Sequence, residues 1–366
     1  MEFTISQDSF AEALRTAGRA VAGRSTIPAL SGMLLEAQGQ ELRIRATDLE
    51  VEITCRAPAR VRTEGAAVLP ARYLSELVRR LPPGPVSVRV APENAVARLV
   101  WEESESVIHG FPADQFPAAG AWTDETAALE IEGAALSTLL RETGFATAHD
   151  ESRPWFTGVF LTVKGETAVA MATDSAVIAY SEARVHNPAD LAFSVILPGR
   201  ALQELGRLLP AAGLCRVLPS HNRFRFAAGD VELTTRLLEG QYPDFRKYLP
   251  AAFPSAVTLS RERFLAACER AALAADQNGI RLEAGPDGLK VTSRTPEVGA
   301  VTERLPADLL GNPFAIPLNV HFVLNGLRSM NGADLLVEYA GPRTAVRFRA
   351  GGGARSYFAV MPLLSF

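Results

Sequence analysis

Apolar residues follow two periods along the chain, one typical of helices and one typical of strands. Spacings of three and four residues occur in six segments, which are residues 9–24, 71–80, 134–149, 200–208, 261–274 and 319–330. In the first segment Phe10, Leu14 and Ala17 share one stripe, and Ser6 or Asp8 can cap its start. The pattern predicts six amphipathic helices.

Between these segments apolar and polar residues alternate with a period of two. Residues 41–46, 51–55 and 344–349 show the alternation clearly, and the polar run 102–105 predicts an exposed hairpin tip. Alternation places one face of a strand on a core and the other in solvent, as in antiparallel sheets with one covered face. Together the segments predict an α+β fold with helices on one face of antiparallel sheets.

Three motifs occur twice, with an offset of about 126 residues. They are Ala-Thr-Asp at 46–48 and 172–174, Leu-Pro-x-Arg at 69–72 and 197–200, and Gln-aromatic-Pro at 115–117 and 241–243. A fainter third copy begins near 257–259 and closes at 360–362. We therefore predict three homologous domains, at residues 1–122, 123–250 and 251–366.

Charge is distributed unevenly. The 366 residues carry a net charge of −4 and give a pI near 5.9, which argues against a protein that grips nucleic acid by bulk electrostatics. The six helical segments nevertheless hold about twice as many basic as acidic residues, so the remainder is acidic. Charge alone leaves two interpretations open, an ordinary solvated helix face or a pooled basic surface. The repeat favours the second.

Candidate chemistry is sparse. Cys55, Cys215 and Cys268 lie far apart, which predicts neither a disulfide nor a zinc site and indicates a reducing compartment. The N-terminus has no signal-peptide pattern and no run reaches ~18 apolar residues, so we expect a cytoplasmic protein that does not cross a membrane. The chain has no P-loop, GxSxG or HExxH motif.

The remaining candidates are explained better by structure than by catalysis. His149-Asp150-Glu151 could form a metal or acid–base site, but a polar loop after a helix explains it better. Asp48 and Asp174 occupy the same place in two repeats, which favours a turn-forming role over a carboxylate pair. Gly351 to Gly353 favours a hairpin over a phosphate loop. We expect no catalytic residue, no metal and no cofactor.

The repeat and three motifs together resemble a known family. The motifs are Ala172-Thr173-Asp174, the run Glu239–Phe245 and the terminal Val360-Met361-Pro362-Leu363. They resemble those of the bacterial sliding clamp, the beta subunit of DNA polymerase III, and the similarity covers the whole chain. The resemblance implies a DNA clamp fold of three repeated domains, each with two helices on antiparallel sheets. It also implies a head-to-tail homodimer ring whose inner wall of twelve helices surrounds duplex DNA.

The function that this resemblance implies is non-catalytic. A sliding clamp encircles double-stranded DNA and confers processivity by tethering the replicative polymerase, and it binds polymerase subunits, the clamp loader and repair proteins through short hydrophobic peptides. An alternative is a specialised clamp paralogue with altered peptide-partner preference. An enzyme would need convergent catalytic groups, and a sequence-specific DNA-binding protein would need a base-reading element.

The resemblance also assigns site residues by position. The DNA-lining positions are Arg24, Arg72, Arg79, Arg80, Arg200 and Arg281, whereas Asp150 stands where the family carries a polar DNA contact. The peptide-binding positions are Phe156, Thr173, Ser175, Ala176, Val177, Ile178, Pro243, Lys247, Tyr248, Ala345, Val360, Met361, Pro362 and Leu363. The dimer interface would pair an edge strand at Val107 and Ile108 with the helix and loop near Leu273 of the partner.

One segment departs from the family pattern. The family usually has Thr-Asp-Gly, then an aromatic residue or His, then Arg-Leu, whereas this chain has Thr173-Asp174-Ser175-Ala176-Val177-Ile178. The segment therefore lacks an aromatic or imidazole ring and a guanidinium. Two outcomes follow: a more apolar site with altered peptide preference, or compensation by neighbours such as Lys247.

Overall fold

The computed structural model describes nearly the whole chain. The described residues are 1–23, 25–91, 93–118, 128–150, 152–209, 213–220, 222–297, 299–352 and 355–364. They form two compact units, and both units contain part of residues 123–250. The first unit consists of Met1–Ala134, His186–Ala189 and Gln203–Leu237, and the second of Ala135–Val185, Asp190–Leu202 and Leu238–Phe366.

Six α-helices occur in the described residues, one in each predicted segment. They are α1 (Gln7–Ala17), α2 (Ala71–Arg79), α3 (Gly133–Gly144), α4 (Gly199–Leu208), α5 (Arg261–Ala272) and α6 (Val320–Ser329). Ser6 caps α1, because its hydroxyl accepts from the backbone N–H of Ser9. Two predicted segments are too long. The α-helix predicted over 9–24 ends at Ala17 and passes into a 3₁₀ turn, Gly18–Ala20, and the one predicted over 134–149 ends at Gly144.

The first unit contains two antiparallel sheets. Its nine-stranded sheet has the order β10 (Phe111–Pro112), β6 (Gly65–Pro70), β2 (Gly32–Gln38), β3 (Glu41–Thr47), β4 (Val51–Pro58), β18 (Val231–Arg236), β17 (Arg223–Ala228), β16 (Leu214–Pro219) and β11 (Leu129–Glu132). Its five-stranded sheet has the order β5 (Arg60–Thr63), β1 (Glu2–Ser6), β7 (Pro85–Val90), β8 (Val96–Trp101) and β9 (Ser104–His109). Residues 102–103 form the predicted hairpin tip between β8 and β9.

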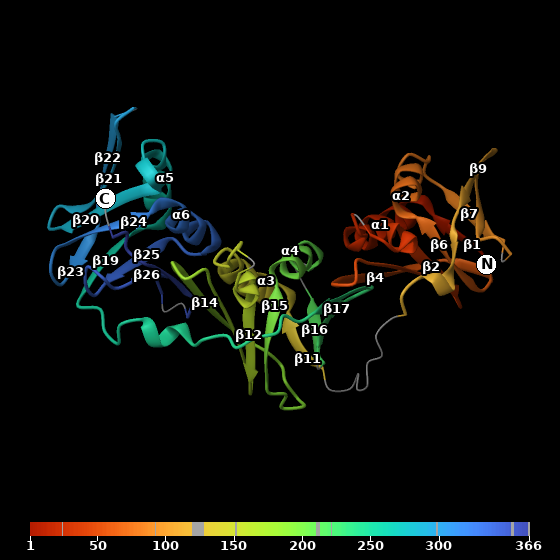
Figure 1. Ribbon diagram of the computed structural model, residues 1–366, viewed down its shortest axis with the longest axis horizontal. Helices are drawn as coiled ribbons and strands as arrows, with labels where there is room; N and C mark the ends of the chain where they lie inside the picture. Colours follow the sequence, from red (N-terminus) through yellow and green to blue (C-terminus); the bar gives the residue numbers. More distant parts are fainter. Residues whose placement is uncertain are drawn as a thin grey trace. The chain divides into compact units, whose positions relative to one another are not determined.

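The second unit repeats this plan (Figure 1). Its nine-stranded sheet has the order β15 (Phe193–Pro198), β12 (Gly158–Lys164), β13 (Thr167–Thr173), β14 (Val177–Arg184), β27 (Tyr357–Val360), β26 (Val346–Ala350), β25 (Asp334–Tyr339), β19 (Ser255–Ser260) and β23 (Asp308–Leu310). Its four-stranded sheet has the order β22 (Gly299–Leu305), β21 (Gly288–Thr295), β20 (Gly279–Gly285) and β24 (Phe314–Asn319).

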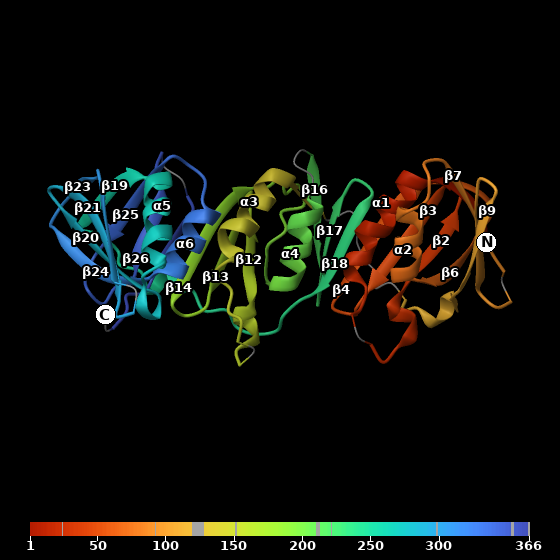
Figure 2. The same cartoon turned by 90° about the horizontal axis from the view of Figure 1, so that it is seen from above.

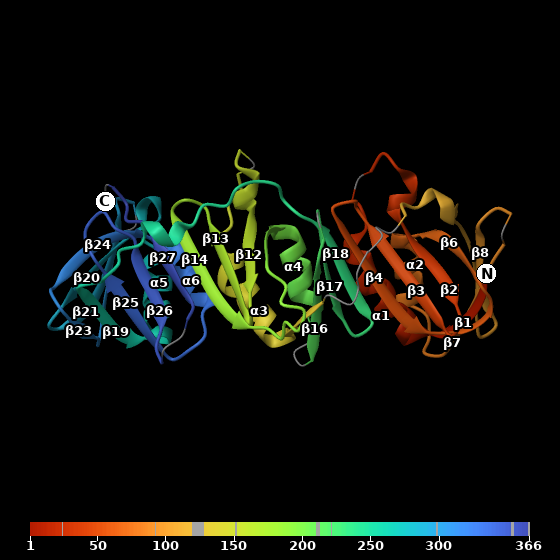
Figure 3. The ribbon, with the colours of Figure 1, turned by 90° about the horizontal axis from the view of Figure 1, so that it is seen from below.

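Helices cover one face of the sheets, as the alternating pattern predicts. In the first unit α1 and α2 lie in front of strands β3 and β4 in Figure 2, and the strands lie in front of the helices in Figure 3. Phe10 and Leu14 of α1 are fully buried against that face, together with Ile44 of β3 and Ile53 of β4. Burial of these side chains is the main source of stability, at ~25 cal/mol per Å² of apolar surface.

Two strand pairs join segments that the sequence assigns to different domains. At the first junction β4 pairs with β18, and Val51 lies opposite Thr235. At the second junction β14 pairs with β27, and Val177 lies opposite Val360. Each nine-stranded sheet is therefore continuous across a predicted domain boundary.

Candidate functional site: a peptide-binding surface and arginine-bearing helices

The Thr-Asp motif at the second junction forms a tight turn between β13 and β14. The Thr173 hydroxyl donates to the carbonyl of Val177 at 2.7 Å and accepts from the N–H of Ser175 at 3.0 Å. The Asp174 carboxylate accepts from the N–H groups of Ala176 and Val177, both at 2.9 Å. Asp174 is thus a turn-forming residue, as predicted. Ser175 has a φ of 84°, a conformation that favours glycine.

The same turn occurs at the first junction. The Thr47 hydroxyl donates to the carbonyl of Val51 at 2.9 Å, and the Asp48 carboxylate accepts from the N–H groups of Glu50 and Val51. Leu49 has a φ of 79° and corresponds to Ser175. The prediction that Asp48 has a turn-forming role is confirmed.

The predicted peptide-binding residues divide into a base and an exposed layer. Thr173, Val177, Ala345 and Val360 are buried beneath the surface, where the β14–β27 pairing holds them together. Met361 is 41% exposed, and its N–H donates to the carbonyl of Ala176 at 2.8 Å. The sheet register therefore brings together chain segments that are far apart in the sequence.

An aromatic cluster adjoins this layer. The ring of Phe156 lies 5.8 Å from that of Tyr242 and 5.6 Å from that of Phe245, and Tyr242 stacks on Phe160 at 5.1 Å. Sequence reasoning selected Phe156 but missed the other three rings, although the repeated Gln-aromatic-Pro motif was a signal for Tyr242. Gly240 has a φ of 146°, and a Cβ there would lie 3.1 Å from the neighbouring Trp155 side chain. This close approach holds the segment against the cluster.

Lys247 and Tyr248 follow on a short 3₁₀ turn, Phe245–Tyr248. The Asp244 carboxylate caps this turn by accepting from the N–H of Arg246 at 3.2 Å. It also accepts from Nε and Nη2 of Arg246 at 2.7 and 2.9 Å, and these charge-assisted bonds lower the pKa of Asp244. Tyr248 is 73% exposed, so its ring is available to a ligand.

The guanidinium of Arg153 lies at the turn between β13 and β14. Nη1 of Arg153 lies 3.4 Å from the Ser175 hydroxyl, and its guanidinium stands 5.5 Å from the centre of the Phe156 ring. The sequence left open either a more apolar site or compensation by neighbours such as Lys247; the neighbouring group at this turn is Arg153, which was not predicted from the sequence. No motif near Arg153 signals this contact, because it depends on how the loop before β12 folds back onto the turn.

The predicted DNA-lining residues lie on several elements. Arg72 is exposed in the first turn of α2 and forms no ion pair with any described residue, and Arg200 is exposed at the start of α4. Arg79 and Arg80 share Glu76, at 2.8 and 3.1 Å, and hydrogen bonds from both lower the pKa of Glu76. Arg281 lies on strand β20 rather than on a helix and pairs with Glu283 at 3.0 Å. Arg24 lies outside the described residues.

Helical glutamates moderate the basic excess on other helices as well. Arg15 pairs with Glu12 at 2.6 Å, Arg207 with Glu204 at 2.7 Å, and Arg328 with Glu269 at 2.8 Å. These pairs are largely exposed and contribute little to stability, ~0 to 1 kcal/mol each. Their effect is to leave a modest positive potential on the helices.

The dimer candidates lie at sheet edges. Val107 and Ile108 belong to β9, the last strand of the five-stranded sheet, and Val107 is 52% exposed. Leu273 follows α5 and is 79% exposed. Helix α5 packs on β22, the last strand of the four-stranded sheet.

Models of three domains of one family match consecutive parts of the chain. They are described as the N-terminal, central and C-terminal domains of the DNA polymerase III beta subunit, and they match residues 1–120, 130–244 and 246–362. A beta sliding clamp of Synechococcus elongatus is 33% identical over 374 residues and matches 99% of each chain. The chain belongs to the DNA polymerase III beta subunit family.

Solved structures of other beta subunits have the same fold. The sliding clamp of Bacillus subtilis matches with a TM-score of 0.96 at 28% identity, over 100% of each chain. A sliding clamp of Pseudomonas aeruginosa bound to griselimycin matches with a TM-score of 0.93 at 26% identity, over 99% of each chain. The prediction of a three-domain clamp fold is confirmed.

Membership of the beta subunit family settles the class of function. The chain is a sliding clamp, a non-catalytic processivity factor of DNA polymerase III. The comparisons do not favour the alternative of a specialised paralogue. No helix among the described residues is long and apolar enough to span a membrane.

The His149-Asp150 segment is a polar loop, as predicted from the sequence. The Asp150 carboxylate accepts from the N–H and the hydroxyl of Ser152, at 2.9 and 2.6 Å. Within the described part of the chain, no group of three His, Cys, Asp or Glu side chains is placed to hold a metal ion. Glu151 and Gly353, which the sequence analysis also considered, lie outside the described residues.

Proposed function

We propose that two copies of the chain close head to tail into a homodimer ring around duplex DNA, in the cytoplasm. In this proposal the surface at the second junction binds short hydrophobic peptides of polymerase subunits, the clamp loader and repair proteins. The observation that carries this proposal is the repeated strand pairing. The boundaries 1–122, 123–250 and 251–366 belong to the same proposal, since each junction lies between two of these segments.

Sheet order supports the ring. The series β6-β2-β3-β4 has two counterparts, β15-β12-β13-β14 and β24-β20-β21-β22, and the series β18-β17-β16-β11 has counterparts in β27-β26-β25-β19 and β9-β8-β7-β1. Strand β4 pairs with β18 and β14 pairs with β27, which leaves the third pair, β22 and β9, as sheet edges. Open edges readily accept another strand. Pairing of β22 with β9 of a second copy repeats the junction a third time and makes a heterologous interface that closes a ring.

The exposed apolar residues fit this seam. Val107 lies on β9, and Leu273 ends the helix that packs on β22. Both side chains are exposed in the protomer, and burial of such side chains at an interface is worth ~1.5 to 3 kcal/mol each. We therefore keep Val107, Ile108 and Leu273 as the proposed dimer contacts.

Weak phosphate contacts suit a protein that slides. Arg72 forms no ion pair with any described residue, Arg200 is exposed at the start of α4, and Arg79 and Arg80 share the carboxylate of Glu76. Phosphate contacts position a protein on DNA without reading sequence. We propose that these residues, with Arg24 and Arg281, make short-lived contacts to the duplex while the ring holds it topologically.

The second-junction surface fits an apolar peptide. Met361 and Tyr248 supply exposed apolar area above the buried Ile178, the aromatic cluster supplies flat rings, and Arg153 and Lys247 supply positive charge at the margin. Apolar surfaces with a few placed polar groups are typical of ligand sites. All the predicted peptide-binding residues belong to this proposed surface.

Retention on closed DNA tests the ring. Clamp loaded on nicked circular DNA should remain bound through gel filtration at ~0.5 M salt, because topology rather than charge holds it, and cutting the circle should release it. Loss from circular DNA at the same rate as from linear DNA would contradict the proposal.

A further inference from the structure

The two junctions are structural repeats of each other, residue by residue. Val51 opposite Thr235 corresponds to Val177 opposite Val360. The next strands in the two sheets, β17 and β26, also correspond: Phe224 of β17 lies opposite Thr235, and Val346 of β26 lies opposite Val360. The preceding residues therefore correspond as well, so that Arg223 stands where the second junction has Ala345.

Equivalent positions carry apolar side chains at the second junction and charged side chains at the first. At the second junction the relevant positions hold Ala176, Ile178, Ala345 and Met361, which belong to the proposed peptide surface. The equivalent positions at the first junction hold Glu50, Glu52, Arg223 and Arg236. An apolar peptide that suits the second junction does not suit the first, because it would have to desolvate four charges.

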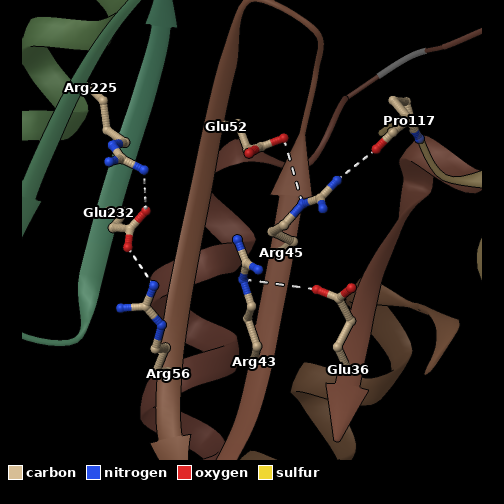
Figure 4. Close-up of polar contacts among 8 residues, drawn as sticks. All are labelled: Glu36, Arg43, Arg45, Glu52, Arg56, Pro117, Arg225 and Glu232. Atoms are coloured by element: carbon tan, nitrogen blue, oxygen red, sulfur yellow. Dashed lines mark hydrogen bonds and ion pairs between the residues drawn. The ribbon is translucent and has the colours of Figure 1, made fainter. Parts of the chain in front are cut away.

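Arginines outnumber glutamates on this face of the sheet. Figure 4 shows part of it: Arg43 next to Glu36, Arg45 next to Glu52, and Arg56 and Arg225 on either side of Glu232. Because cross-strand partners share a face, Arg223 and Arg236 lie there too. This face is opposite to the one that α1 covers.

Two pairs of arginines lie directly opposite each other on neighbouring strands. Arg223 is the register partner of Arg236, and Arg43 is the partner of Arg56. Like charges directly opposite each other destabilise a sheet. Arg236 has only a distant carboxylate, Glu50 at 3.8 Å, and Arg223 forms no ion pair with any described residue. An anion between them would remove the repulsion.

A small cavity opens between these arginines and the turn. It has a volume of ≈ 40 Å³, and its lining includes the arginines Arg223 and Arg236 and the glutamates Glu50 and Glu52. The cavity lies in the first unit and is formed by the counterparts of the elements that make the peptide surface in the second unit.

A buried cation stands behind this cavity. The Arg45 side chain is only 6% exposed, its Nη2 donates to the carbonyl of Pro117 at 2.6 Å, and its guanidinium lies 5.4 Å from the Phe116 ring centre. Its Nε has no hydrogen-bond acceptor among the described residues, since the nearest carboxylate oxygen, on Glu52, is 3.6 Å away. Burial raises the pKa of Glu52 and so weakens the carboxylate nearest to Arg45.

We propose that the first junction is a second docking site of the protomer, and that it takes an acidic peptide whose carboxylates lie between Arg223 and Arg236. The second junction selects apolar side chains, and the first selects negative ones.

The probe for this site is a blocked peptide of six glutamates. Titration into the full-length protein at ~50 mM salt should give saturable binding that weakens at higher salt. The double variant R223Q/R236Q should lose at least ~10-fold in affinity, which corresponds to about 1.4 kcal/mol. The matched variant E50Q should bind more tightly, because it frees Arg236 from its carboxylate.

Two control ligands separate this proposal from the function proposed above. An apolar clamp-type peptide should bind R223Q/R236Q with unchanged affinity and should not compete with the glutamate peptide. Retention on circular DNA should also be unchanged, so a failure there would concern the ring and not this site. Both substitutions replace outward-facing charges, and a thermal melt verifies folding; if the double variant does not fold, R236Q and E50Q alone carry the test.

Three results would overturn the proposal. One is equal affinity of R223Q/R236Q and the original chain for the glutamate peptide. Another is displacement of that peptide by the apolar peptide, which would assign both to the second junction. The third is tighter binding of a single-stranded oligothymidine that R223Q/R236Q abolishes, which would make the ligand a nucleic acid.

Discussion

At the scale of single residues, Asp244 links the aromatic cluster to the exposed turn with Lys247 and Tyr248. Its carboxylate caps the 3₁₀ turn and binds two nitrogens of Arg246, which lowers its pKa from the ordinary value of 3.8. A carboxylate with a lowered pKa contributes stability above its ordinary pKa, and that contribution is lost as the pH falls through the lowered value.

We predict that Asp244→Asn lowers the free energy of unfolding by about 0.5 to 1 kcal/mol at pH 7, since the group is partly exposed and solvent screens the pair. Urea denaturation at pH 7 and at pH 3 measures the effect. The difference between variant and original should shrink at pH 3. Asp287→Asn, in the exposed turn between β20 and β21, serves as the control and should show no loss. A pH-independent loss would contradict the charge argument.

Some residues of the site were predictable and others were not. Asp48 and Asp174 were recognisable as turn formers because they recur in two repeats, and the structure shows the same hydrogen bonds at both. Arg153 was not, since its contact with Ser175 spans a turn and a strand and leaves no spacing in the sequence. Tyr242 lay in a recognised motif, but only the structure shows its stacking on Phe160.

At the scale of elements, the position of β27 depends on how closely α6 approaches it. Gly326 of α6 lies over the buried ring of Phe358 on β27, and a Cβ at Gly326 would stand 2.5 Å from that ring. The absence of a side chain lets the helix pack directly on the strand that bears Val360. The shape of the peptide surface thus depends on a glycine on the opposite side of the sheet.

We predict that Gly326→Ala destabilises the protein by about 1 to 3 kcal/mol, because the ring and strand must move to admit the methyl group. It should also weaken binding of an apolar peptide, since β27 shifts. Gly206→Ala on α4 is the matched control: a Cβ there meets nothing within 4 Å, so we expect a gain of about 0.4 to 1 kcal/mol. Thermal melts and one peptide titration measure both; equal melting temperatures would contradict this packing argument.

The positions of helices and strands could be predicted from the sequence better than the residues at which the helices end. Apolar periodicity located all six described helices and the strands tested, because burial of one face dominates their formation. The helix ends at Ala17 and Gly144 were missed; after Ala17 the chain continues as a 3₁₀ turn, Gly18–Ala20, which the spacing of apolar residues does not distinguish from an α-helix. Strand order across the junctions depends on long-range pairing and leaves no local pattern.

At the scale of the whole molecule, the proposed seam between β9 and β22 makes a testable claim about assembly. Val107→Asp puts a charge on the exposed face of edge strand β9 without disturbing the core, and we predict that it shifts the dimer toward monomer by at least ~10-fold in dissociation constant. Sedimentation equilibrium measures this shift. Val100→Asp, on the internal strand β8, is the control and should remain dimeric. A dimeric Val107→Asp variant would place the interface elsewhere.

The three kinds of junction in the proposed ring differ in whether the two paired strands belong to the same chain. In the proposed ring the first and second junctions form within one chain, so their strands meet at an effective concentration in the millimolar range. The β9–β22 seam has no linker, and its occupancy depends on the amount of protomer present. The same kind of strand pairing is therefore more stable at the two junctions within a chain than at the seam between two chains. A ring built this way has two symmetry-related interfaces at which it can open. Dilution of the protomer, without any change in the contacts, lowers the fraction of rings that are closed.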